Sequence, residues 1–365
     1  MGSIQDIDSR NKIHGGFPLP VDLIRTVAIT MVLVYHAITE PYNAALLSST
    51  QYSVLWLSST IYESFVIMGV PLFVMLSGSL LLQPSKVNEP IRVFLKKRLG
   101  RIGLAFLFWS AIYLVWNYYV IHKALTVNSV IQMFLSGGVD YQFWFIYLIM
   151  GLYLITPILR IVVAYADRKV LRYLIILWFI GVGLIPLFHL ISGFSLDNNL
   201  FLVGGYIGYF VLGFYLIGNH VRTKLLKWLL AGSIIWTIIG AYLMAYLFHS
   251  LNQYYFFFDT LSANVIIASI VVCMLLSKFP SDWPGKSHPK LSRLMHVISL
   301  NTLPIYFFHV IVLETLNMGF LGFKLSLTVI SPVIEIPLAA AATLFLTLGL
   351  ILLMKKVPIL RKLIG

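Results

Sequence analysis

Long apolar runs constrain this chain most, because a helix of about 20 apolar residues crosses the roughly 30 Å hydrocarbon core of a bilayer. Hydrophobic residues make up 59% of the 365 residues and charged residues only 11%, and the mean hydropathy is +0.91. Short polar, basic or Pro/Gly-containing segments separate apolar runs at 18–40, 53–82, 101–121, 142–163, 171–191, 199–218, 226–249, 256–277, 296–318 and 327–354. The sequence therefore predicts an all-α polytopic membrane protein, a bundle of about ten transmembrane helices.

One membrane domain is predicted at residues 18–354, between a cytoplasmic segment at 1–17 and a basic cytoplasmic tail at 355–365. The first seventeen residues lack the apolar core and cleavage pattern of a signal peptide. The run at 53–82 exceeds one straight span and contains GVP at 69–71 and SGS at 77–79. We expect it to be kinked, tilted or partly re-entrant.

The net charge of +13 has a one-sided distribution. With ten spans and a cytoplasmic N-terminus, all of the 26 Lys and Arg except Lys123 and Lys324 fall on the cytoplasmic side or at the span ends beside it. The positive-inside rule describes this pattern. We therefore expect both termini in the cytoplasm, a multi-pass location in the cell (inner) membrane, and no nucleic-acid partner. The oligomeric state cannot be predicted.

The single cysteine, Cys273, lies within an apolar run. One cysteine excludes an intrachain disulfide and a Cys-rich metal site. We expect Cys273 to be a small buried core residue and the protein to use no metal.

Ionisable residues inside apolar runs are the candidate site residues, since each costs a few kcal/mol unless it faces the bundle interior, water or a partner. Arg25 and His36 are eleven residues apart, so they project from the same face of one helix about 16 Å apart along its axis. Asp22 lies one turn before Arg25 and can hold its guanidinium in place. The alternative is an interfacial arginine and a core histidine.

Arg98 and Arg101, in the sequence RLGR, share one face at the cytoplasmic start of the third span. Such a pair can bind phosphate groups bidentately. It can equally be charge that sets the topology.

The ninth run places Asn301, Tyr306, His309 and Glu314 on one predicted helix. Measured from Arg293 along a continuous helix, His309 lies about 24 Å and Glu314 about 31 Å toward the outer surface. A contact between Glu314 and His36 would orient the imidazole as a general base. His189 and Glu63, in contrast, are interpreted as ordinary loop or interface residues.

Six motifs, in order, resemble those of the acyltransferase-3 family of integral-membrane acyltransferases. They are VDLIRTVAITMVLVYH (21–36), VPLFVMLSGSLLL (70–82), KKRLGRIG (96–103), FWFIYLIMGLYLITPIL (143–159), YFVLGFYLIG (209–218) and NTLPIYFFHVIVLE (301–314). The resemblance covers most of the chain. Some longer members of the family carry an additional extracytoplasmic hydrolase-like domain, which we do not expect in this chain.

The resemblance implies that Arg25, His36, Arg98 and Arg101 are essential, and it assigns an acidic functional residue to Glu314. It also implies transfer of an acyl group, usually acetyl, from cytoplasmic acyl-coenzyme A to a sugar hydroxyl outside or at the outer face. We expect the arginines to bind the phosphates of acetyl-CoA, and the acceptor to be an extracytoplasmic glycan or a lipid-linked sugar. Membrane lipid is the other expected partner.

Two mechanisms are compatible with this pattern. His36 either deprotonates the acceptor hydroxyl as general base, which we favour, or accepts the acetyl group covalently. Ser77 or Tyr306 could donate to the thioester oxyanion, although helix packing and an interfacial aromatic are the alternatives for these two residues. A transporter or flippase of a lipid-linked or small anionic substrate is the rival functional class, since intramembrane His, Glu and Arg are expected there too.

Overall fold

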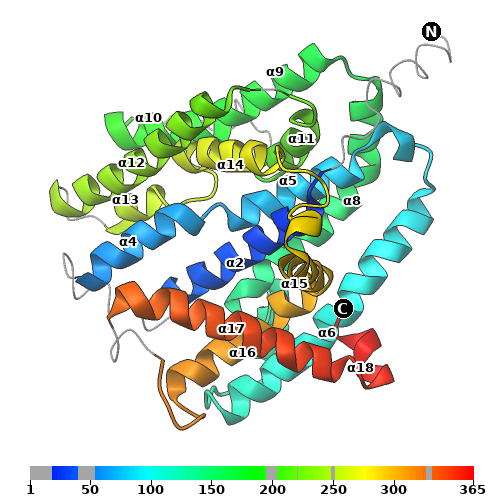
Figure 1. Ribbon diagram of the computed structural model, residues 1–365, viewed down its shortest axis with the longest axis vertical. Coiled ribbons are helices and arrows are strands. Elements are labelled where there is room, and N and C mark those ends of the chain that lie inside the picture. Colours follow the sequence, from blue (N-terminus) through cyan, green and yellow to red (C-terminus); the bar gives the residue numbers. More distant parts are fainter. Residues whose placement is uncertain (1–18, 40–53, 195–203, 220, 248–250, 326–330) are drawn as a thin grey trace. The chain divides into compact units, whose positions relative to one another are not determined.

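The computed structural model describes residues 19–39, 54–194, 204–219, 221–247, 251–325 and 331–365. Every regular element in these ranges is a helix, which confirms the predicted all-α class (Figure 1). The predicted cytoplasmic segment 1–17 lies outside the described residues. The chain divides into two compact units, neither of which is continuous in sequence. The first comprises residues 1–24, 71–94 and 154–295, and the second comprises 25–70, 95–153 and 296–365.

Seven helical segments among the described residues are long and apolar enough to cross a membrane: Val21–Ile38, Val54–Leu81, Ile91–Tyr119, Tyr141–Tyr165, Arg168–Ser192, Thr223–Ala245 and Pro332–Met354. A bent pair of helices adds an eighth if it is counted as one span. The two remaining runs contain shorter helices, α11 (Ile207–Tyr215) and α14 (Ala263–Leu276). The polytopic helical architecture is confirmed, whereas the count of ten and the cytoplasmic termini remain predictions.

The predicted run at 53–82 is interrupted. Helix α4 (Val54–Val66) ends two residues before α5 (Gly69–Leu81) begins, directly ahead of the GVP sequence. The interruption agrees with the expected irregularity of this run.

The ninth run is not one helix, because α15 (Pro289–Leu300) and α16 (Thr302–Met318) meet at an angle of 82°. The Asn301 side chain donates to the Val297 carbonyl at 2.7 Å, and its backbone N–H bonds to Ile298 instead. Pro304 has no N–H with which to continue the ladder. The rise measured from Arg293 was therefore wrong: from Thr302, His309 lies about 10 Å and Glu314 about 18 Å along α16.

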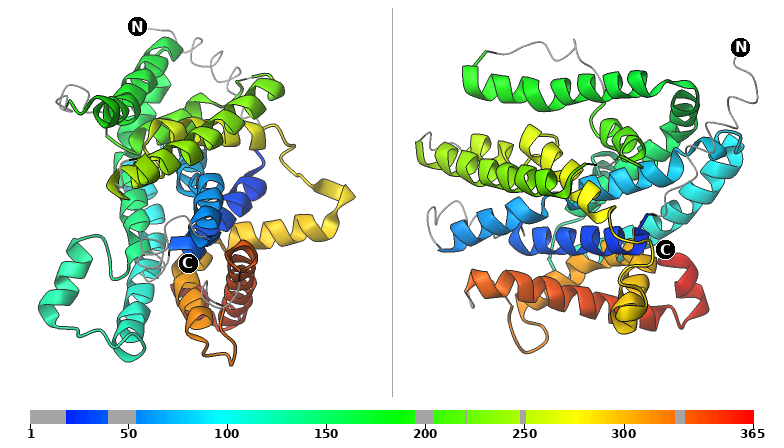
Figure 2. Two further views of the ribbon diagram at one scale, coloured as in Figure 1. Left: turned by 90° about the vertical axis from the view of Figure 1, so that its left-hand side faces the viewer. Right: turned by 45° about the horizontal axis from the view of Figure 1, so that its top comes forward.

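The first unit packs α12 (Thr223–Leu247) along α14 and α13 (Leu251–Phe256), and α11 against α9 (Arg168–Phe179). Figure 1 and Figure 2 show the α12 and α14 ribbons side by side. Arg160 is buried in this unit, where it pairs with Glu89 at 2.9 Å and donates to the Leu81 carbonyl at 2.8 Å. The unit also contains most of α5, η1 (Pro84–Lys86), the π-helical segment η3 (Ile180–Leu184), α10 (Ile185–Ser192), η5 (Gly285–Ser287) and most of α15.

The second unit packs α17 (Pro332–Met354) along α16 and against α4. The predicted basic tail folds into this unit, where it forms α18 (Pro358–Leu363). The Trp109 indole donates to the carbonyl of Ile364, which is fully buried, at 3.3 Å. The unit also contains most of α2 (Val21–Thr39), α6 (Ile91–Tyr119) from residue 95, α7 (Val127–Leu135), η2 (Tyr141–Phe143) and the first part of α8 (Trp144–Tyr165).

Two glycines allow α5 and α11 to approach closely within the first unit. A Cβ at Gly78 would lie 1.8 Å from the Phe210 carbonyl oxygen, and a Cβ at Gly213 would lie 1.9 Å from the Met75 carbonyl oxygen. Small residues permit such close helix contacts in membranes. The SGS sequence in the second run is therefore explained by helix packing.

Gly213→Ala should destabilise the protein, because the added methyl group forces the α5 and α11 backbones apart. The expected loss is about 1–3 kcal/mol, as for other overpacked cores, and it is measured by thermal unfolding in detergent. Gly232→Ala is the matched control, since nothing lies within 4 Å of its added Cβ. The control should be neutral or slightly stabilising. Equal unfolding midpoints for the two variants would contradict the close crossing.

Candidate functional site

Most of the predicted site residues lie in the second unit, which holds Arg25, His36, Arg98, Arg101, Tyr306, His309 and Glu314. Two lie in segments assigned to the first unit. Asp22 is in the first turn of α2, and Ser77 is on α5.

Three helices bring positive charge to one place in the second unit. Arg25 on α2, together with Arg98 and Arg101 on α6, lies close enough to the Tyr153 hydroxyl on α8 to interact with it electrostatically. The Nε atom of Arg98 is buried and has no hydrogen-bond partner in the ranges that the structure describes. Convergent guanidinium groups form a binding site for phosphate or carboxylate groups.

Lys355, directly after α17, extends this cluster. Burial lowers the pKa of its ammonium group, and the nearby Arg101 guanidinium lowers it further. From the sequence, Lys355 is predicted only as part of the basic tail. We call Arg25, Arg98, Arg101 and Lys355 the cationic cluster.

His36 lies further along α2, where its ring packs between side chains from two other segments. The ring centroid lies 5.0 Å from that of His309 on α16 and 5.2 Å from that of Tyr141 on η2. His36 is 7% exposed, and within the described part of the chain its Nδ1 has no hydrogen-bond partner. The imidazole is thus almost enclosed, with one nitrogen facing protein.

Backbone carbonyls fix the residues next to His36. His309 Nδ1 lies 2.7 Å from the Tyr306 carbonyl oxygen, and the Tyr306 hydroxyl donates to the Gln142 carbonyl. The Gln142 side chain is fully buried, and no described residue forms a hydrogen bond with its oxygen or its nitrogen. Unpartnered buried amides are uncommon, so Gln142 is a candidate functional residue that sequence reasoning missed.

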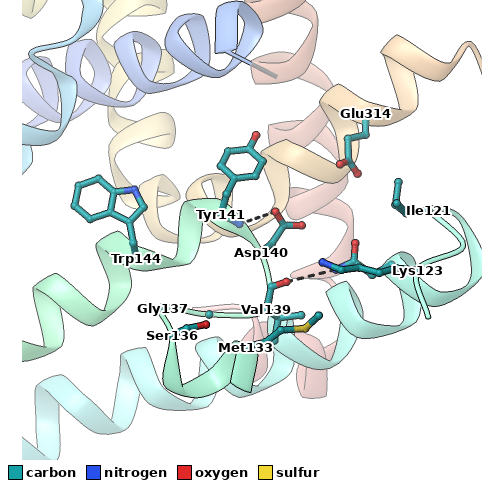
Figure 3. Close-up of a pocket in the computed structure, with 12 residues that line it drawn as sticks. Ile121, Lys123, Met133, Ser136, Gly137, Val139, Asp140, Tyr141, Trp144 and Glu314 are labelled. Carbon is teal, nitrogen blue, oxygen red and sulfur yellow. Dashed lines mark hydrogen bonds between the residues drawn. The ribbon is translucent and has the colours of Figure 1, made fainter. Parts of the chain in front are cut away.

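A pocket of about 410 Å³ opens at the far end of α6 from Arg98. Its lining residues are Asn117, Ile121, Lys123, Met133, Ser136, Gly137, Gly138, Val139, Asp140, Tyr141, Trp144 and Glu314. Figure 3 shows the carboxyl groups of Asp140 and Glu314 directed toward one another. We call this space the acidic pocket.

The two carboxyl groups of the acidic pocket have defined partners. Glu314 accepts from the Trp116 indole at 2.5 Å, and Asp140 accepts from the Tyr141 backbone N–H at 2.7 Å. Burial raises the pKa of Asp140 to about 6, although this N–H and the Lys123 ammonium group oppose the shift. At pH 7 Asp140 is mostly ionised.

The distance between the cationic cluster and the acidic pocket matches a bilayer. Arg98 and Asn117 are nineteen residues apart on α6, a rise of about 28 Å, close to the roughly 30 Å hydrocarbon core. His36 lies near the pocket end, since Tyr141 both contacts its ring and lines the pocket.

Some contacts differ from those considered in the sequence analysis. Glu314 accepts a hydrogen bond from the Trp116 indole, whereas the His36 ring packs against His309. Tyr306 already donates its hydroxyl proton to a carbonyl. Glu63 is buried in the last turn of α4 and is not a loop residue, whereas His189 is exposed near the end of α10.

Tyr153, Asp140 and Gln142 were all missed in the sequence analysis. Only Asp140 carries a signal that could have been used. It is an acidic residue in the sequence GGVD (137–140), just before the apolar run at 142–163. Tyr153 and Gln142 occur in stretches whose composition is ordinary for a membrane helix and its end.

A family comparison identifies the chain. A family model described as an acyltransferase domain matches residues 20–353. No curated protein and no solved structure matches the chain in the corresponding searches. Because the family match covers nearly the whole sequence, the protein belongs to the acyltransferase-3 family of membrane acyltransferases.

Proposed function

We propose that this protein is an O-acyltransferase of the cell (inner) membrane that moves an acetyl group from cytoplasmic acetyl-CoA to a hydroxyl of an extracytoplasmic or lipid-linked glycan. The family supports acyl transfer in a membrane. The observation that carries the finer proposal is one helix, α2, with Arg25 in the cationic cluster and His36 beside the acidic pocket. The family match does not favour the transporter alternative.

The cationic cluster is the proposed donor end. Coenzyme A carries a pyrophosphate and a ribose phosphate, which the guanidinium groups of Arg98 and Arg101 can bind through charge-assisted hydrogen bonds. Its pantetheine arm extends on the order of 15 to 20 Å, judged from chain reach. The rise from Arg25 to His36 is about 16 Å, so a thioester held by its phosphates can reach the imidazole.

The acidic pocket is the proposed acceptor end. Asp140 and Glu314 can accept hydrogen bonds from sugar hydroxyls, and the half-exposed rings of Tyr141 and Trp144 supply flat apolar surface. We propose a glycan acceptor because the motifs resemble those of the O-acetyltransferase of enterobacterial common antigen. The volume of about 410 Å³ suits one or two sugar rings better than a whole chain.

His36 is the proposed general base. It accepts the proton of the acceptor hydroxyl, whose oxygen attacks the thioester carbonyl carbon. The C–S bond then breaks, and the proton passes to the departing coenzyme A thiolate. The products are an acetyl ester and coenzyme A, so no metal or redox partner is needed.

The developing oxyanion needs a hydrogen-bond donor. The Tyr306 hydroxyl is already engaged with a carbonyl, so it is a poor candidate without rearrangement. The unpartnered side-chain amide of Gln142 is the better one.

Arg98→Ala should weaken binding of acetyl-CoA about 10- to 100-fold, because one or two charge-assisted hydrogen bonds are lost. Isothermal titration of the detergent-solubilised protein measures the affinity. The control is Arg172→Ala, which removes an equal charge from the exposed surface of α9 and should leave binding within twofold. Equal losses in both variants would mean that only net charge matters.

His36→Ala should reduce turnover of radiolabelled acetyl-CoA by about 10²- to 10⁴-fold, the usual contribution of a general base. An octyl glycoside serves as the acceptor probe, and binding of the donor should be unchanged. His189→Ala, compared at equal thermal stability, should retain full activity.

The same labelling experiment distinguishes the two mechanisms. A general base leaves no label on the protein. Acetyl label retained on wild type and lost in His36→Ala would replace the general base with a covalent acetyl-histidine. No thioester turnover in wild type, with any acceptor or with water, would contradict the proposed function.

A further inference from the structure

Two nitrogens on neighbouring histidine rings are both buried, and neither has a hydrogen-bond partner among the residues that the structure describes. They are Nδ1 of His36 and Nε2 of His309, and the ring centroids lie 5.0 Å apart at an interplanar angle of 38°. Buried polar atoms normally find a hydrogen bond. Two such atoms on adjacent rings therefore suggest that each is the partner of the other in the working enzyme.

The tautomer of His309 follows from its environment. Its Nδ1 lies 2.7 Å from the Tyr306 carbonyl oxygen, and a carbonyl oxygen only accepts hydrogen bonds, so Nδ1 carries the proton. A neutral imidazole protonated there has its lone pair on Nε2. His309 is fully buried, where a second proton on the ring would be costly. His309 Nε2 is therefore a hydrogen-bond acceptor, and no described residue donates to it.

We propose that His309 is a positioning residue for His36: its Nε2 accepts a hydrogen bond from His36 Nδ1–H. This bond fixes the His36 tautomer and leaves the lone pair of His36 Nε2 for the acceptor hydroxyl. A small rotation about the broad terminal torsion of His36 closes the gap between the two nitrogens. The catalytic part of the role rests on the proposed acyl transfer.

The difference in exposure separates the two roles. His36 retains 7% exposure, whereas His309 has none. A substrate can therefore meet only His36, and His309 acts through it. When His36 takes the proton from the acceptor hydroxyl, the Nδ1–H to Nε2 bond stabilises the resulting imidazolium, and the proton leaves again with coenzyme A.

Two hydrogen bonds of Tyr306 hold His309 in place. The Tyr306 carbonyl fixes its Nδ1, and the Tyr306 hydroxyl bonds to the backbone of Gln142. Gln142 directly follows Tyr141, whose ring also contacts His36. The pair is thus supported from α16 and from η2, directly before α8, as the supporting shell of a precise site requires.

Two substitutions of His309 test the pair. Gln places its amide oxygen near the position of the imidazole Nε2 and can accept the same hydrogen bond, whereas Phe fills the volume without an acceptor. His309→Phe should lower kcat about 10- to 100-fold, as for other residues that orient an imidazole, with KM for acetyl-CoA within twofold. His309→Gln should stay within about fivefold of wild type in kcat.

A second readout needs no acyl transfer. Diethyl pyrocarbonate modifies neutral imidazole, and peptide mass spectrometry reports the rate at His36 alone. His309→Phe should slow this modification several-fold, and His309→Gln should largely restore it. Unchanged coenzyme A affinity in both variants shows that they are folded, and His309→Leu replaces the Phe variant if the larger ring does not fit.

The outcomes separate this inference from the proposed function. In a His36→Ala background, His309→Phe should cause no further loss of turnover, because coupled residues are not additive. Wild-type kcat and modification rate in His309→Phe, or equal impairment in the Gln and Phe variants, would overturn the positioning role. Absence of acyl transfer in wild type would contradict the proposed function only, since the modification rates still decide whether His309 positions His36.

Discussion

The burial of polar side chains among apolar helices is the constraint on which the candidate site depends. A helix that crosses hydrocarbon can shield a guanidinium or an imidazole only against other protein, because lipid offers no hydrogen bonds. In the second unit, α2, α6 and α16 each contribute an arginine or a histidine, and α8 contributes the Tyr153 hydroxyl. The site therefore exists only while these helices stay packed, and its residues cannot be interpreted one helix at a time.

Helix α6 connects the two ends of the site. Arg98 and Arg101 lie near its beginning, and Asn117 lies in its last turn beside the acidic pocket. Two hydrogen bonds tie α6 to α16: the Tyr113 hydroxyl donates to the Phe307 carbonyl at 2.8 Å, and the Trp116 indole donates to Glu314 at 2.5 Å. These bonds set the register of α16 and hence the height at which His309 meets His36.

The sequence predicts which residues share a face of one helix. It does not predict which residues of two different helices contact each other. Helical pitch alone placed Arg25 and His36 on one face of α2. The neighbour of His36 depends on how α16 is rotated and bent, and Asn301 and Pro304 bend it by 82°. The choice of His309 over Glu314 as that neighbour, and the meeting of the arginines at Tyr153, could therefore not be read from spacing.

Transfer of an acetyl group across the bilayer requires the cationic cluster and the acidic pocket to open on opposite faces of the membrane. Single cysteines at Lys97 and Lys123, both exposed on the second unit, can be placed in a Cys273→Ser background, which removes the chain's only cysteine. A membrane-impermeant maleimide is then applied to sealed vesicles of known orientation. We expect the cysteine at position 97 to react only from the cytoplasmic face and the cysteine at position 123 only from the other. Labelling of both positions from the same face would contradict transfer across the bilayer.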